Sequence, residues 1–71
     1  MSELFGRAVR SVRQAQGLSQ EALAARAGIH RTYVSSIELG KVAISISIAQ
    51  KLPVALGLPL SKLIQDVERL L

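Results

Sequence analysis

The stretch from Arg31 to Ser36 carries the chain's most informative chemical groups. One guanidinium and three hydroxyls stand there at spacings that leave them on the outer side of a helix. The four residues are Arg31, Thr32, Ser35 and Ser36. A guanidinium can donate two hydrogen bonds to O6 and N7 of guanine, a contact worth about 1 to 3 kcal/mol of discrimination. These residues therefore favour contact with base edges in the major groove of DNA, and a phosphate contact is the alternative for Arg31.

A short helix and a glycine turn must precede this polar face to position it. Ser19 predicts the helix start, because its hydroxyl can accept a hydrogen bond from a backbone N–H of the first turn. Leu23 and Ala27 fall on one face, and Gly28 follows as the residue best suited to a left-handed turn. We therefore expect this helix to end at about Ala27.

The second helix begins after His30, which occupies the N-cap position. Val34 and Ile37 form an apolar i, i+3 pair that faces inward, opposite the polar face. Together the two elements predict a helix-turn-helix over about residues 19–39.

Two strings in this segment, SQEALAARAGI and HRTYVSSIE, carry a family resemblance. The segment resembles the Cro and lambda-repressor type of domain, also called XRE-like, and the second string is similar to the controller proteins of bacterial restriction-modification operons. The resemblance covers roughly residues 4 to 64. It implies an all-α, compact five-helix DNA-binding domain whose second and third helices form the helix-turn-helix.

The resemblance also implies where the DNA backbone is held. Gln20 is similar to a residue that bonds a phosphate and braces the first recognition residue. Tyr33 is expected to pack its ring against the domain and turn its hydroxyl to a phosphate, with packing alone as the alternative. Basic residues recur every three positions at Arg7, Arg10 and Arg13, either as a solvated face or as phosphate contacts. The expected backbone contacts are Gln20, Tyr33, Lys41, Ser45, Arg10 and Arg13. Glu38 is expected to form a structural salt bridge to Arg10 or Arg13.

The loop after the second helix departs from the family pattern. Controller proteins carry basic and amide residues where Leu39, Val42 and Ala43 stand here. Fewer phosphate contacts predict weaker non-specific affinity. The alternative is that these residues and Ile44 form an exposed apolar patch for another protein, such as RNA polymerase, a toxin or a neighbouring subunit.

Residues 44–57 permit two interpretations. Ile44, Ile46 and Ile48 alternate with serines, a pattern typical of an edge strand. A lone strand would have no partner, so we favour a helix that begins at about Ile46, is capped by Ser45 and is kinked near Leu52 because Pro53 follows.

The C-terminal segment, about residues 60–71, predicts a helix with a wide apolar stripe. The expected dimerisation residues on it are Leu60, Ile64, Val67, Leu70 and Leu71. A small domain needs only part of such a stripe to close its core, so the remainder favours a second copy. Burial of the whole stripe within one chain is the alternative.

Length and composition limit the possible functions. The 71 residues suffice for one domain, residues 1–71, and the net charge of +4 is compatible with DNA. The chain has no cysteine and one histidine, so we expect no metal and no cofactor. The apolar run Leu52–Leu60 contains two prolines and a glycine and is too short to span a bilayer, so we expect no membrane contact and a cytoplasmic location.

The sequence as a whole favours a transcriptional regulator that binds an inverted-repeat operator in double-stranded DNA as a homodimer. The alternative is a protein-interaction module, antitoxin-like or antirepressor, on the same fold. An enzyme is not expected, because the chain offers no set of nucleophile, base and orienting group and no glycine loop for phosphates.

Overall fold

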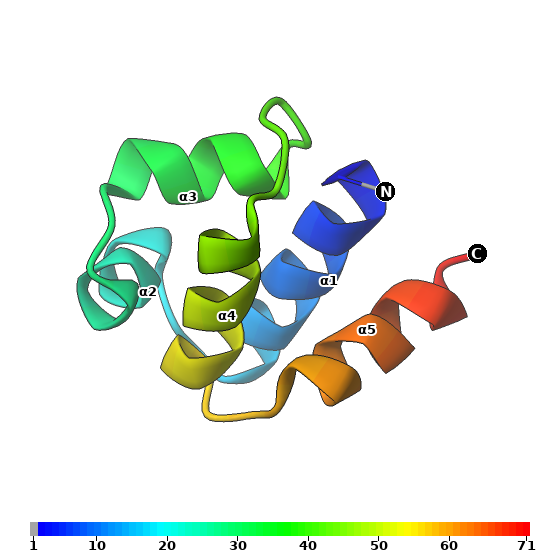
Figure 1. The fold of residues 1–71 in the computed structure, drawn as a ribbon. Coiled ribbons are helices and arrows are strands. Elements are labelled where there is room, and N and C mark those ends of the chain that lie inside the picture. The colour runs from blue at the N-terminus through cyan, green and yellow to red at the C-terminus, as the bar shows by residue number, and fades with distance from the viewer. Residues whose placement is uncertain (1) are drawn as a thin grey trace.

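The structure is a computed structural model that describes residues 2–71, and these residues form five helices and no strand (Figure 1). The helices are α1 (Ser2–Ala15), α2 (Gln20–Ala27), α3 (Arg31–Glu38), α4 (Ile46–Ala55) and α5 (Leu60–Arg69). The expected all-α, five-helix fold is confirmed. No helix within residues 2–71 is both long enough and apolar enough to cross a membrane.

The helix boundaries follow from local capping chemistry. Ser19 Oγ accepts a hydrogen bond from the Ala22 backbone N–H at 3.0 Å, and Ser45 Oγ accepts one from that of Ile48 at 3.2 Å. His30 Nδ1 lies 3.5 Å from the Thr32 nitrogen, a longer contact of the same kind. Gly28 ends α2 with φ of 70°, the left-handed conformation that glycine adopts without steric cost. These predicted caps are confirmed.

The helices share one hydrophobic core to which each contributes. Its largest fully buried side chains include Leu23 of α2, Ile37 of α3, Leu52 of α4 and Leu63 of α5. Helices α3 and α5 both pack against α1, on different parts of its surface. Helix α1 is therefore the common support for the two elements expected to contact DNA and a second copy.

Helix α4 extends through Pro53, whose side chain is fully buried. The strand alternative for Ile44, Ile46 and Ile48 is wrong. Helix α4 begins at Ile46, as predicted. Proline has no N–H to donate to the preceding turn, but its ring adds apolar area to the core from inside the helix.

Gly6 sets how closely α1 approaches α3. A Cβ atom on Gly6 would overlap the Ile37 carbonyl oxygen and lie 3.0 Å from Glu38 Cα. Both are backbone atoms, which cannot move aside as a flexible side chain can. The last turn of α3 is therefore held directly against the α1 backbone.

Candidate nucleic-acid interface

Helix α3 lies along one edge of the molecule (Figure 1). Val34 and Ile37 are fully buried, as expected for the inward pair. On the opposite side Arg31 and Thr32 are exposed. Ser35 and Ser36 are half-buried one turn further along. The structure thus presents the four predicted base-contacting residues from one short helix whose inner face is anchored in the core.

A buried polar network fixes the C-terminal end of α3. Arg13 donates from Nε to Glu38 Oε2 at 2.6 Å and from Nη2 to Glu38 Oε1 at 3.0 Å. Only 10% of the Arg13 side chain and 2% of the Glu38 side chain are exposed. Arg13 Nη1 also donates to the Leu18 carbonyl at 2.7 Å. The predicted salt bridge of Glu38 is confirmed, with Arg13 as its partner.

The same network corrects the assignment of Arg13 to the DNA backbone. Its guanidinium is buried and bonded at all three nitrogens, so it cannot reach a phosphate. Residues three apart differ by about 60° around a helix, so Arg13 points about 120° away from Arg7. Arg7 and Arg10 remain exposed, and the predicted basic stripe is therefore limited to these two residues.

Gln20 also departs from the expected geometry. Its Nε2 donates to Glu38 Oε1 at 3.0 Å, so the amide supports the end of α3, whereas the resemblance implied support for its start. A primary amide has a second N–H, which remains available to a phosphate. Gln20 therefore connects the first turn of α2 to the network beneath α3.

The loop between α3 and α4 is only partly the exposed patch expected from its sequence. Val42 and Ile44 are half-buried and pack against the core, so they expose less apolar surface than expected. Leu39 is 57% exposed and Ala43 is exposed as well. Lys41 is exposed at the start of this loop, as a phosphate contact requires.

Two further residues near α3 are placed by their side chains. Tyr33 is half-buried and packs against the core, as expected for its ring. Ser45 is exposed, and its oxygen accepts the cap bond of α4 while its own O–H is left to donate. His30, which the sequence analysis treated only as a cap, is exposed directly before Arg31.

The apolar stripe of α5 divides in three. Leu63 and Val67 are buried in the core, so Val67 is corrected as a dimerisation residue because it has no surface to offer a second chain. Leu60 and Ile64 are 38% and 39% exposed. Leu70 is also 38% exposed, but it lines a groove beside α1 that neither Leu60 nor Ile64 lines, so the structure separates it from those two predicted dimerisation residues.

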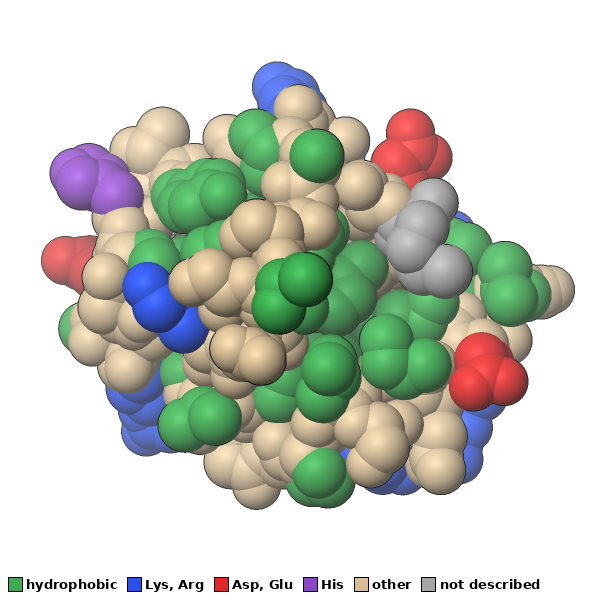
Figure 2. Space-filling view, in the orientation of Figure 1, with side chains coloured by type: hydrophobic (Ala, Val, Ile, Leu, Met, Phe, Trp, Pro, Cys, Tyr) green, Lys and Arg blue, Asp and Glu red, His purple; other side chains and the backbone are tan. Residues whose placement is uncertain are grey.

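Leu60 and Ile64 belong to a larger apolar surface. They line a depression of about 400 Å³ together with Ser2, Phe5, Ala43, Ile44 and Ala49. Figure 2 shows hydrophobic side chains gathered on this side of the molecule, over α4 and α5. Leu71, just beyond α5, is also exposed.

Comparisons with known proteins agree with this geometry. Residues 9–63 match the helix-turn-helix family. The control protein C.MunI of a Mycoplasma species is 41% identical over 66 residues, which cover 92% of this chain and 89% of that protein. The crystal structure of the restriction-modification controller protein C.AhdI from Aeromonas hydrophila is 39% identical, with a TM-score of 0.83 over 86% of this chain and 92% of that one.

A third comparison concerns the fold alone. The controller protein C.Esp1396I, solved as a tetramer in complex with its natural 35 base-pair operator, has a TM-score of 0.81 at 23% identity. The match covers 93% of this chain and 92% of that one. The relatives that are 38% to 44% identical to the chain include restriction-modification control proteins and the helix-turn-helix transcriptional regulator PuuR.

Proposed function

The chain belongs to the helix-turn-helix family, with restriction-modification control proteins among its homologues, and from this premise we propose that it binds operator DNA in a sequence-specific manner. The observation that carries the proposal is the outer face of α3. Arg31 and Thr32 are exposed on a helix whose opposite side is fully buried and whose end is fixed by Glu38. A preorganised helix of this kind suits insertion into a major groove.

In this proposal Arg31 contacts a guanine, and Thr32, Ser35 and Ser36 contact neighbouring bases. Phosphates are held by Arg10, Lys41, the free N–H of Gln20 and the hydroxyls of Tyr33 and Ser45. The positive end of the α2 dipole favours a phosphate near Gln20. The protein would therefore contact DNA phosphates on both sides of the major groove that α3 enters.

We propose a homodimer that forms through the apolar surface around Leu60 and Ile64, with Leu71 at its edge. A two-fold pair suits an inverted repeat, because it presents two copies of α3 to major grooves about 34 Å apart. The exposed apolar side chains on α5 support this interface.

The biological role follows the homologues. We propose that the chain regulates transcription in the cytoplasm by binding alone, without catalysis, and that RNA polymerase is the machinery it recruits or blocks. The control proteins among its relatives support this role. No contact with polymerase is implied for any particular residue.

The test is a fluorescence-anisotropy titration of a random-sequence duplex at several salt concentrations. A DNA-binding protein gives log K that falls linearly with log salt, with a slope of about −0.9 for each phosphate contacted. Absence of binding even at low salt would contradict the proposal. It would favour a protein-interaction module that uses the exposed Leu39 and its surroundings.

A further inference from the structure

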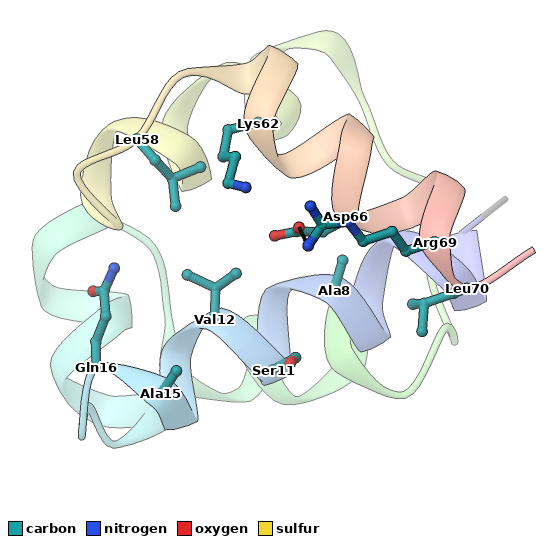
Figure 3. Close-up of a pocket in the computed structure, with 10 residues that line it drawn as sticks. All are labelled: Ala8, Ser11, Val12, Ala15, Gln16, Leu58, Lys62, Asp66, Arg69 and Leu70. Carbon is teal, nitrogen blue, oxygen red and sulfur yellow. Dashed lines mark ion pairs between the residues drawn. The ribbon is translucent and has the colours of Figure 1, made fainter.

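A second groove runs between α1 and α5 on the far side of α5 from Ile64. It has a volume of about 480 Å³. Figure 3 shows its apolar side chains along the gap between the two helices, with Lys62, Asp66 and Arg69 projecting from α5. The apolar lining residues are Ala8, Val12, Ala15, Leu58 and Leu70.

The charged rim of this groove is predominantly basic. Asp66 is paired with Arg69, with 3.7 Å between the carboxylate and guanidinium atoms. Lys62 makes no ion pair with any residue of 2–71. The groove is thus lined by two cations, Lys62 and Arg69, and one anion, Asp66. An occupant that carries negative charge beside apolar groups would therefore complement the site.

The proposed DNA contacts and the proposed dimer surface both leave this groove uncovered. Helix α3 contacts α1 and α2, whereas the groove lies along the α5 side of α1 (Figure 1). The proposed dimer surface uses Leu60 and Ile64, neither of which lines the groove. A protein bound there would occupy neither DNA contacts nor the dimer surface.

We propose that this groove binds an acidic amphipathic helix of a partner protein. Most of its lining residues are exposed, so it is too shallow to bury most of a small molecule, as a typical ligand pocket does. A shallow trough between two helices suits an apolar helix face, and the small, exposed side chains of Ser11 and Ala15 permit close approach. Glutamates on the partner helix would lie beside Lys62. Only the claim that DNA and partner bind together rests on the proposed function.

The test uses a fluorescein-labelled helical peptide of about 16 residues, with leucines at i, i+3, i+4 and i+7 and glutamates on both flanks. Saturable anisotropy is expected, and Lys62→Glu should weaken binding about fivefold or more, because it reverses a charge at the rim. Ala15→Phe should abolish binding by filling the groove. Matched controls are Lys51→Glu and Ala25→Phe, equivalent changes at exposed positions on α4 and α2.

Each outcome decides the proposal. Loss of peptide affinity in Lys62→Glu and Ala15→Phe, with both controls unchanged, supports the proposal. Loss of binding when the glutamates of the peptide are replaced by lysines also supports it. No saturable binding, or equal loss in the controls, would overturn it. A wild-type dimer that Ala15→Phe converts to monomer in sedimentation would also overturn it, because the groove would then hold a second copy. Competition between the peptide and a random-sequence duplex would overturn only the claim that DNA and the partner bind together. If the duplex does not bind at all, the proposed function is contradicted, but the proposal that the groove binds an acidic helix is unaffected.

Discussion

Helices α3 and α5 both pack against α1, yet the protein holds them by different means. The end of α3 is fixed by Glu38, whose carboxylate accepts hydrogen bonds from Arg13 and Gln20. Helix α5 is anchored by Leu63 and Val67, and its remaining apolar side chains continue into the surface. Directional bonds define one orientation of a helix, whereas apolar contact can be extended by any complementary surface. The difference suits α3 to reading a fixed pattern and α5 to adding a second chain.

The largest effect is expected from breaking the network beneath α3. Glu38→Ala leaves the buried Arg13 guanidinium without a counter-ion and should lower the free energy of unfolding by about 3 to 5 kcal/mol. Urea denaturation measures this loss. Replacing both partners, Arg13→Met with Glu38→Leu, should recover most of the stability because no charge remains buried. A double variant no more stable than Glu38→Ala would contradict this explanation, because the loss would then not come from an uncompensated buried charge.

Two neighbouring residues, Leu63 and Ile64, test the division of α5 into a buried side and an exposed side. Leu63→Ala should cost about 2 to 5 kcal/mol, since it opens a cavity in the core. Ile64→Ala, one position along, should cost no more than about 0.5 kcal/mol of protomer stability because its side chain lies at the surface. Urea denaturation at a protein concentration low enough to populate monomers makes the comparison. Equal losses at both positions would contradict the division of the stripe.

Charged substitutions test the proposed dimer surface around Leu60 and Ile64. Leu60→Glu with Ile64→Glu should weaken dimerisation about 30-fold or more, because four carboxylates would be brought into one apolar interface. Sedimentation equilibrium measures the dissociation constant. Leu70→Glu is the matched control, since Leu70 lies in the groove beside α1 and should leave the dimer intact. A dimer that resists the double change and yields to Leu70→Glu would place the interface at the groove.

A smaller effect is expected at the DNA backbone. Arg10→Ala should weaken binding to all duplexes roughly equally and reduce the salt slope by about 0.9, the value of one phosphate contact. Arg26→Ala removes the same charge from the far end of α2 and serves as the control. Anisotropy titrations across a salt series measure both. An unchanged salt slope for Arg10→Ala would show that Arg10 belongs to a solvated face and makes no phosphate contact.

Features encoded by neighbouring residues were predictable from the sequence. Ser19, Gly28 and Ser45 act within four residues of their own positions, so the starts of α2 and α4 and the end of α2 were predicted correctly. The inward pair of Val34 and Ile37 follows in the same way from helical spacing.

Features that depend on distant partners were not predictable with the same detail. Arg13 turns inward because it pairs with Glu38, which lies 25 residues later on the buried side of α3. Gln16 donates to the Leu56 carbonyl, 40 residues away, at 2.7 Å, and no local pattern marks that bond. The apolar stripe of α5 was recognised, but its division among core, surface and groove depends on how α1 and α4 lie against it.

In the proposed function, the outer face of α3 determines which DNA sequence is bound. The most direct test of this role is selection of bound duplexes from a random pool, with sequencing of the retained fraction, for the natural chain and for Arg31→Ala, with Arg26→Ala as the matched loss of charge. The account predicts an enriched inverted repeat that contains a guanine in each half-site, retained by Arg26→Ala and lost at that guanine in Arg31→Ala. The same repeat, with the same guanine, enriched by Arg31→Ala would contradict it.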